Sequence, residues 1–329
     1  MNIVFFGTSE FGATVLEKLV QANTKPVLVV TTPDKPAGRS LKLTPSPVKV
    51  AAQKYSLEVA QPVKLGPAKF DSNLAGPSLI PDLFVVASYG AILPKEVLDV
   101  PKKGTLNVHP SLLPTYRGPS PVHTAILNGD KETGVTIMLL DEKMDHGPIL
   151  AQQEFSIFNF QFSKPTFPEL RDKLAELGAE LLIKTIPQWV EGKIQAIPQD
   201  DSRATYTKIF AKEDGKIDWN RPAEEIECQM RAFTPWPGTF TVFKGHNLKI
   251  LKVAVFNRNL VQNLVGPSFP KLGPTKFTPG TVFLTEDKKL AIQCGEGALV
   301  IEELQLEGKK PMSSKEFLLG HKDIIGSKV

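Results

Sequence analysis

The sequence contains little cysteine and no long apolar run. Its 329 residues include only two cysteines, Cys228 and Cys294, with neither CxxC spacing nor a histidine pair nearby. This scarcity excludes a disulfide scaffold and a cysteine-based metal site, and we expect no metal. No apolar run reaches the roughly 20 residues that a membrane helix requires, and the opening residues MNIVFFG are typical of a buried strand rather than a targeting peptide. We therefore expect a cytoplasmic protein.

Two further signals are missing or weak. The first turn, GTSEFG, lacks the GxGxxG spacing that seats a dinucleotide pyrophosphate on a helix N-terminus, so a nicotinamide cofactor is not expected. The net charge of +4 permits contact with nucleic acid without requiring it. Hydrophobic residues make up 41% of the chain and charged residues 22%, which is an ordinary globular composition, and 329 residues favour two domains over one.

The first 150 residues alternate short apolar runs with helix-like segments, a pattern typical of βα units on a parallel sheet. Proline and the bases Lys35, Arg39 and Lys42 follow the second apolar run, which predicts a long basic loop over 32–47. The pattern predicts strands at 2–6, 27–31, 83–87, 105–108, 135–140 and 149–155, and helices at about 11–19, 46–55, 119–128 and 168–189.

The chain changes character near residue 194. Residues 194–207 are polar and unpatterned, which predicts a linker between a first domain at 1–193 and a second at 208–329. The second part suits an OB-like barrel or another small barrel, and Asn257–Phe277 interrupts it as an insertion of unassigned topology. Its predicted elements are a helix at 223–231 and strands at 239–243, 248–256, 280–284, 289–293 and 298–306.

The densest polar cluster follows the strand predicted at 105–108. Asn107 and His109 alternate with an apolar residue, so they face the same side of that strand, and ligands of open α/β sheets bind at the carboxyl ends of strands. An amide can stabilise an oxyanion and an imidazole can transfer a proton. The polar segment 141–147 offers acids to orient the imidazole. A histidine satisfied at a strand end, beside acids on a solvated turn, would give the same pattern, so both interpretations stay open on residue types alone.

Several segments carry a resemblance to a known family. They are GTSEF, PDKPAGR with PSPVKV, SYGAILP, LNVHPSLLPTYRGPSP, GDKETGVTIMLLDEKMDHGPIL and RAFTPWPGT. In this order they resemble the methionyl-tRNA formyltransferase family over nearly all 329 residues. The NxH and SLLPxYRG block is specific to folate-dependent formyltransferases and related hydrolases, while the basic loop and the RAFxPWPG segment narrow the resemblance to the tRNA enzymes. It implies a Rossmann-like formyltransferase domain with a parallel-rich sheet, followed by a C-terminal OB-like β-barrel domain.

The resemblance implies a reaction and its catalytic residues. The family's catalytic asparagine, histidine and aspartate correspond to Asn107, His109 and Asp145, and all three are present. The formyl group would pass from 10-formyltetrahydrofolate, a cosubstrate, to the α-amino group of methionine on initiator Met-tRNA. Asn107 and protonated His109 would stabilise the oxyanion, and Asp145 would orient His109. The neighbouring His146 receives no role.

Binding residues also follow from the resemblance. Arg39 is expected to contact the tRNA acceptor end, and Lys35 and Lys42 to add phosphate contacts. The folate is expected to lie against Ser111, Leu112, Leu113 and Pro114, with Tyr89 and Gly90 beside them.

Three alternatives remain. The first is a formyltransferase of the same fold that acts on an amino-sugar nucleotide or a purine precursor, against which the basic loop and the OB-like tail argue. The second is a hydrolase that releases formate from the folate, for which the tRNA-contacting segments would have no use. The third is a non-catalytic RNA-binding protein, which the intact Asn107, His109 and Asp145 disfavour. Besides tRNA and folate we expect no membrane partner, and a monomer.

Overall fold

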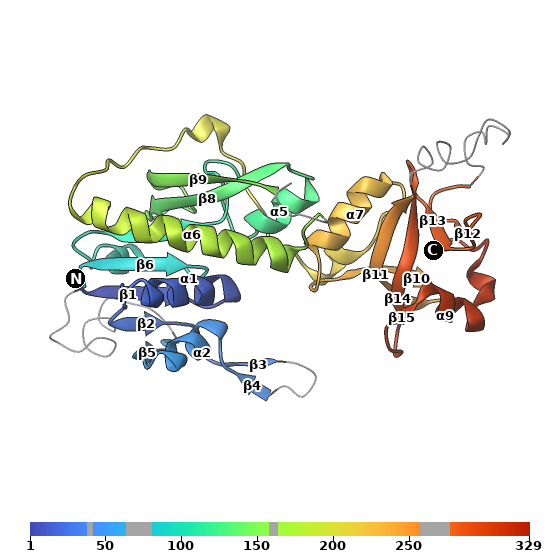
Figure 1. The fold of residues 1–329 in the computed structure, drawn as a ribbon, viewed down its shortest axis with the longest axis horizontal. Coiled ribbons are helices and arrows are strands. Elements are labelled where there is room, and N and C mark those ends of the chain that lie inside the picture. Colours follow the sequence, from blue (N-terminus) through green and yellow to red (C-terminus); the bar gives the residue numbers. More distant parts are fainter. Residues whose placement is uncertain (38–41, 64–80, 158–163, 257–276) are drawn as a thin grey trace. The chain divides into compact units, whose positions relative to one another are not determined.

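The computed structural model describes residues 1–37, 42–63, 81–157, 164–256 and 277–329 (Figure 1). The chain divides into two compact units. The first comprises Met1–Val122, Lys131–Lys164 and Pro168–Ile209, and the second comprises His123–Asp130, Pro165–Phe167 and Phe210–Val329. None of the helices within these described ranges is long and apolar enough to cross a membrane.

The first unit is built on a seven-stranded sheet in the order β5-β2-β1-β6-β7-β8-β9. The five strands from β5 to β7 run parallel, whereas β8 and β9 are antiparallel, which confirms the predicted parallel-rich α/β fold. The strands are β1 (Ile3–Gly7), β2 (Leu28–Val30), β5 (Val59–Ala60), β6 (Leu83–Ala87), β7 (Thr105–His109), β8 (Glu132–Leu139) and β9 (Ile149–Ser156). All residues of β1, β2, β6 and β7 are buried, as expected for parallel strands covered on both faces.

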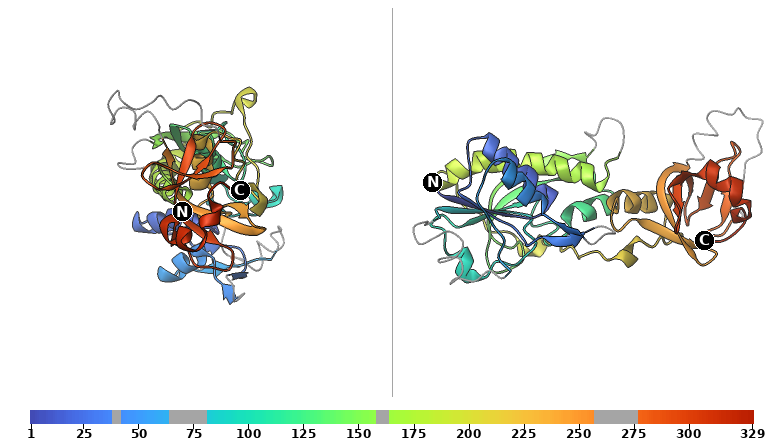
Figure 2. Two further views of the ribbon diagram at one scale, coloured as in Figure 1. Left: turned by 90° about the vertical axis from the view of Figure 1, so that its right-hand side faces the viewer. Right: turned by 90° about the horizontal axis from the view of Figure 1, so that it is seen from below.

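Helices cover both faces of this sheet. α1 (Glu10–Gln21) and α6 (Phe167–Val190) lie on the same side (Figure 2). Gly178 of α6 lies so close to β7 that an added Cβ would come within 2.6 Å of Val108 Cγ1. Val4 and Phe6, which alternate with the residues facing the other side, pack in a cluster with Val97 of the short helix α4. The remaining helices of the first unit are α2 (Pro47–Lys54) and α4 (Lys95–Leu98), whereas α5 (Pro121–Leu127) begins in the first unit and continues into the second.

The basic segment after β2 is not only a loop. Lys35–Ala37 (β3) and Lys42–Thr44 (β4) pair as antiparallel strands, with Lys35 opposite Thr44 and Ala37 opposite Lys42. The prediction of a loop over 32–47 is therefore wrong in part, because Pro36 fits a strand of an isolated two-stranded sheet, where few backbone N–H groups must pair. Ser46 caps α2 by accepting a hydrogen bond from the Lys49 N–H, as its Ser-Pro sequence suggests.

The segment expected as a linker has structure of its own. Ile149 and Ile197 exchange two backbone hydrogen bonds, and Arg117 pairs with Tyr206 as an isolated bridge. Asp201–Arg203 form a 3₁₀ turn (η3). Residues 197–207 thus lie on the sheet and loops of the first unit, and the domain boundaries drawn from the sequence remain a prediction.

The second unit holds an antiparallel sheet in the order β10-β11-β14-β13-β12, with β15 paired to β14. Its core joins Ile226 and Met230 of α7 with strand residues such as Leu248 and Leu299, and with Phe317 of α9. The predicted insertion at Asn257–Phe277 falls, except for Phe277, outside the described residues. The elements are α7 (Ala223–Ala232), β10 (Thr239–Phe243), β11 (His246–Phe256), β12 (Val282–Leu284), β13 (Leu290–Gln293), β14 (Ala298–Leu306), β15 (Met312–Ser313), α9 (Ser314–Gly320) and the 3₁₀ turns η4 (Lys212–Gly215) and η5 (Lys322–Ile324).

His123 of α5 lies in an aromatic cluster of the second unit. Its ring stacks on Phe167 with 3.7 Å between centroids, and Phe210 lies 5.7 Å away. Burial disfavours the charged imidazolium and lowers the pKa of His123 to about 4.

Acid should therefore destabilise the protein through His123. The unfolded chain binds the proton with an ordinary histidine pKa, so stability is lost as the pH falls from about 6.5 towards 4, by about 3 kcal/mol at most. His123→Phe keeps a ring in the cluster and should remove this part of the loss. Urea unfolding at pH 7 and pH 4.5 measures it. The exposed His246→Phe is the control, and equal pH dependence in His123→Phe and the parent would contradict the prediction.

Candidate functional site

β7 carries the two polar side chains that the sequence analysis singled out. Asn107 and His109 are polar, yet their side chains are only 8% and 4% exposed because they lie on a strand of the central sheet. They are two residues apart, so both side chains leave the same face of β7 near its carboxyl end. Among the described residues, no hydrogen-bond partner is found for the Asn107 side-chain amide. A nearly buried amide of this kind can donate a hydrogen bond to a ligand.

His109 lies between a carbonyl and a carboxylate. Its Nε2 is 2.9 Å from the Tyr116 carbonyl oxygen, and its Nδ1 is 3.7 Å from Asp145 Oδ1. A carbonyl can only accept, so Nε2 carries a proton and a second proton on Nδ1 would meet the Asp145 carboxylate. The structure therefore brings together Asn107, His109 and Asp145, which the resemblance named from distant parts of the sequence.

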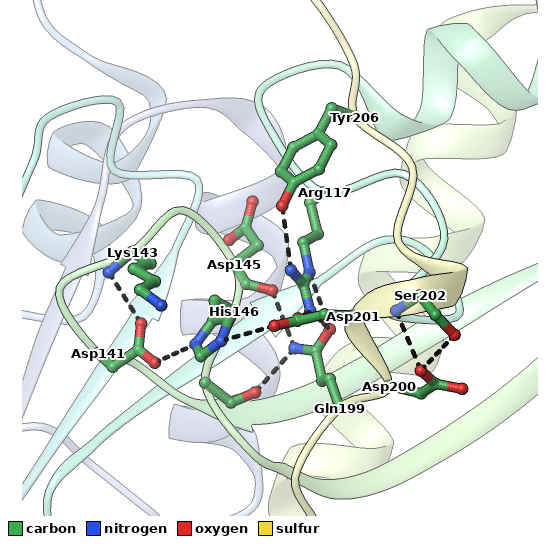
Figure 3. A network of polar contacts seen from close by, with 11 residues as sticks. Arg117, Asp141, Lys143, Asp145, His146, Gln199, Asp200, Asp201, Ser202 and Tyr206 are labelled. Atoms are coloured by element: carbon green, nitrogen blue, oxygen red, sulfur yellow. Dashed lines mark hydrogen bonds and ion pairs between the residues drawn. The ribbon is translucent and has the colours of Figure 1, made fainter.

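Asp145 is held by its side chain and by its backbone. Its Oδ2 accepts a hydrogen bond from the Gly118 N–H at 2.7 Å. Its φ of +46° lies in the left-handed region, which is uncommon for a residue other than glycine and persists where the surroundings fix it. Figure 3 shows the surroundings, a network of Arg117, Gln199, Asp201, Tyr206 and His146.

This network was not predicted from the sequence. Arg117 is 1% exposed and donates to Gln199, Asp201 and Tyr206. Burial opposes its charge, but the hydrogen bonds to Asp201 and Tyr206 outweigh burial and raise the pKa of Arg117, and the same bond to Arg117 lowers the pKa of Asp201. His146, for which no role was predicted, bridges Asp141 (Nδ1 to Oδ2, 2.6 Å) and Asp201 (Nε2 to Oδ2, 3.4 Å).

The segment predicted to hold the folate is a tightly bonded loop. Leu113 donates its N–H to Thr136 Oγ1, and its carbonyl accepts from Gln152. The Ser111 hydroxyl donates to the Thr115 carbonyl. Most of the loop's polar groups are thus engaged within the protein, which leaves mainly apolar surface for a ligand. Leu112 is partly exposed, and the Leu113–Pro114 peptide bond is cis.

Tyr89 and Gly90 lie at the carboxyl end of β6 and differ in environment. The Tyr89 ring is 4% exposed and packs edge-on against Phe6, and burial raises the pKa of its hydroxyl. Gly90 is exposed, and no atom would lie within 4 Å of an added Cβ. Thr8 in the first turn donates to the Tyr89 carbonyl, which ties the ends of β1 and β6 together.

A cavity of about 530 Å³ lies beside the amino end of β7 and the start of the Asp141–Gly147 loop. This size suits a small organic ligand. Its walls are apolar with charged groups at intervals, formed by Lys95, Leu98, Asp99, Gly104, Thr105, Leu139, Leu140, Asp141, Glu142, Lys143 and Pro148. No group of three or more His, Cys, Asp or Glu side chains in the described part of the chain could hold a metal ion.

Of the three bases predicted to contact tRNA, the structure describes two. Lys35 and Lys42 are exposed, and the β3–β4 register places both on one face of the hairpin, with Pro36 and Leu43 on the other. Arg39 lies outside the described residues.

Two family models match the chain. "Formyl transferase" matches residues 1–186, and "Formyl transferase, C-terminal domain" matches residues 210–322. Methionyl-tRNA formyltransferase of Chloroflexus aurantiacus is 44% identical over 329 residues, which cover 99% of each chain. That of Geobacter sulfurreducens is 38% identical over 320 residues, covering 97% of this chain and 94% of the relative.

Solved structures share the fold at low identity. An N-formyltransferase from Helicobacter canadensis, in complex with folinic acid and dTDP-3-aminofucose, has a TM-score of 0.60 at 18% identity and covers 92% of this chain and 98% of its own. HypX from Aquifex aeolicus, in complex with tetrahydrofolic acid, has a TM-score of 0.59 at 17% identity. The match covers 98% of this chain but 47% of HypX, so this chain spans about half of that protein.

Gly118, which donates to Asp145, should tolerate no side chain. Its φ is +109°, and an added Cβ would come within 2.9 Å of Thr207 Oγ1 and 3.0 Å of the Thr207 carbonyl oxygen. Gly118→Ala should lower the free energy of unfolding by about 2–3 kcal/mol, since strain and overlap add. Gly192→Ala is the control, because Gly192 has a φ of +71° with open space around it. Urea unfolding would contradict this account if the two variants lost equal stability.

Proposed function

The chain belongs to the methionyl-tRNA formyltransferase family, and from this premise we propose that it transfers a formyl group from 10-formyltetrahydrofolate to the α-amino group of methionine on initiator Met-tRNA, for translation initiation. The observation that carries the proposal is the convergence of Asn107, His109 and Asp145 at the end of β7. The likeness to the sugar N-formyltransferase is evidence for the fold alone, whereas the relatives at 38–44% identity span both units.

The three polar side chains divide the chemistry among them. When bound, 10-formyltetrahydrofolate supplies an electrophilic formyl carbon. The Asn107 amide is free to donate a hydrogen bond to an oxygen that gains negative charge. His109 would accept at Nδ1 the proton that the amine loses and pass it to the folate nitrogen that gives up the formyl group, and the Asp145 carboxylate lies 3.7 Å from Nδ1. The distance exceeds a hydrogen bond, and such contacts in ligand-free enzymes commonly shorten when substrate binds.

The cavity beside β7 is the proposed site for the folate ring system. Thr105 of β7 lines it, and Asn107 lies two residues further along the strand, a rise of about 7 Å. A ring in the cavity could therefore direct its formyl group towards Asn107. Gly90 and Ser111–Pro114 do not line this cavity, because they follow the carboxyl ends of β6 and β7. They would border the part of the folate that lies outside the cavity, Gly90 through its open backbone and Ser111, Leu112, Leu113 and Pro114 through the shape of their loop. Tyr89, which is buried against Phe6, would support the backbone at Gly90.

The β3–β4 hairpin is the proposed contact for the tRNA acceptor end. Lys35 and Lys42 share a face, so both could approach one phosphate backbone. Arg39 stands between these strands in the sequence, where a guanidinium could contact phosphate or stack on a base.

Asn107→Ala should abolish most of the activity. Loss of one oxyanion donor costs about 2.7–4 kcal/mol, so kcat should fall about 100- to 1,000-fold with little change in KM. Transfer of labelled formyl from 10-formyltetrahydrofolate to initiator Met-tRNA measures it, with elongator Met-tRNA and no acceptor as controls. Formate release without formylated tRNA would favour the hydrolase, and unchanged transfer by Asn107→Ala would show the assigned chemistry to be wrong.

Replacing Lys35 and Lys42 together by alanine should weaken tRNA binding without changing folate binding. Each lost phosphate contact makes a plot of log Kd against log salt concentration shallower by about one, so the pair should reduce the slope by about two. Filter binding of initiator Met-tRNA at several salt concentrations tests this. The exposed Lys173→Ala on α6 is the matched control. An unaltered slope in the double variant would remove the hairpin from the tRNA contact.

A further inference from the structure

The buried guanidinium of Arg117 orients the side chain of Gln199. Nε and one terminal nitrogen of Arg117 donate to Gln199 Oε1 at 3.0 and 2.9 Å. Because guanidinium can only donate, the oxygen of the Gln199 amide must face it and the NH₂ group must point the other way. Tyr206 and Asp201 accept the remaining bonds of the guanidinium that the structure records, at 3.1 and 2.7 Å. The amide of Gln199 therefore has one permitted orientation (Figure 3).

The NH₂ group of Gln199 binds the loop that carries Asp145. It donates to the Asp145 carbonyl at 2.9 Å and to the Gly147 carbonyl at 2.7 Å. Reversing the amide would set its oxygen against two carbonyl oxygens, so both ends of Gln199 fix the same orientation. Asp145 itself sits at a φ of +46°, which needs such external support. The Gly118 N–H holds the carboxylate of the same residue at 2.7 Å.

Residues 199–201 also anchor the beginning of the Asp141–Gly147 loop. Asp201, two residues after Gln199, bonds to Arg117 through Oδ1 and lies 3.4 Å from His146 Nε2 through Oδ2. His146 in turn bonds to Asp141, the first residue of the loop, at 2.6 Å. Contacts from 199–201 thus reach Asp145, His146 and Gly147 directly and Asp141 through His146, which holds the loop at both its beginning and its end.

We infer that Gln199 is a positioning residue, which acts through the backbone of Asp145 and is itself oriented by Arg117. This inference rests on the proposed function, because it concerns the carboxylate that serves His109 in that reaction. Gln199 contacts no reacting group. Its loss should let Asp145 move away from His109, and a displacement of about 1 Å in a catalytic group can cost about 100-fold in rate.

Two substitutions distinguish the hydrogen bonds that Gln199 accepts from Arg117 from those that it donates to the Asp145 and Gly147 carbonyls. Gln199→Met has similar length but can neither donate nor accept in this way, and Gln199→Glu still accepts from Arg117 but cannot donate to the two carbonyls. Both variants should lower kcat for Met-tRNA formylation by about 10- to 100-fold while KM for Met-tRNA and for the folate changes less than about twofold. The exposed Gln153→Met on β9 is the matched control and should keep the parental kcat.

A double-mutant cycle separates positioning from general loss of structure. In an Asp145→Asn background the carboxylate is already gone, so adding Gln199→Met should lower kcat by less than about twofold. Thermal unfolding of each variant confirms that it is folded at the assay temperature. The inference is overturned if either Gln199→Met or Gln199→Glu keeps the parental kcat. It is also overturned if Gln199→Met lowers kcat by the same factor in the Asp145→Asn background as in the parent protein. If the parent protein transfers no formyl group, the proposed function is overturned, and the positioning role of Gln199 in that reaction is overturned with it.

Discussion

The buried charge of Arg117 is the constraint on which the geometry of the site depends. A guanidinium taken out of water must have its hydrogen bonds satisfied, and leaving one unpaired would cost several kcal/mol. Arg117 meets this requirement through Gln199, Asp201 and Tyr206, which belong to a segment more than eighty residues further along the chain. That segment is therefore held against the rest of the first unit, and the loop of Asp145 is held against the segment.

Much of the fold could be predicted because apolar periodicity and burial agree. β1, β2 and β6 are buried on both faces, so each appears in the sequence within a short continuous apolar run such as IVFFG or LFVVA. Alternation along β7 also predicted that Asn107 and His109 share a face. The β3–β4 hairpin was missed because proline usually argues against a strand, and a two-stranded ribbon at the edge of the protein relaxes that rule.

The rest of the site could not be predicted from local pattern. Gln199, Asp201 and Tyr206 lie in a polar stretch without periodicity, and such a stretch has the composition of a linker. Their partner Arg117 is distant in the sequence, and only folding of the chain brings them into contact with it. Asp145 was identified through resemblance, since three acids in 141–147 were equally plausible by residue type; among these acids, the structure sets the carboxylate of Asp145 beside His109 and that of Asp141 beside His146. The assignments of folate and tRNA contacts remain proposals.

The composition of the second unit has a consequence for the order in which the chain becomes structured during synthesis. His123 and Phe167 belong to that unit, yet both precede Phe210 and Phe233, which complete the aromatic cluster. A ribosome releases the two earlier rings well before the later ones exist, so at that stage of synthesis those rings have no partners from the 210–233 region. No single cut in the chain separates the two units, because the second unit takes in parts of the chain that lie within the span of the first. The second unit can therefore be completed only around segments made earlier, after the chain beyond residue 210 has left the ribosome.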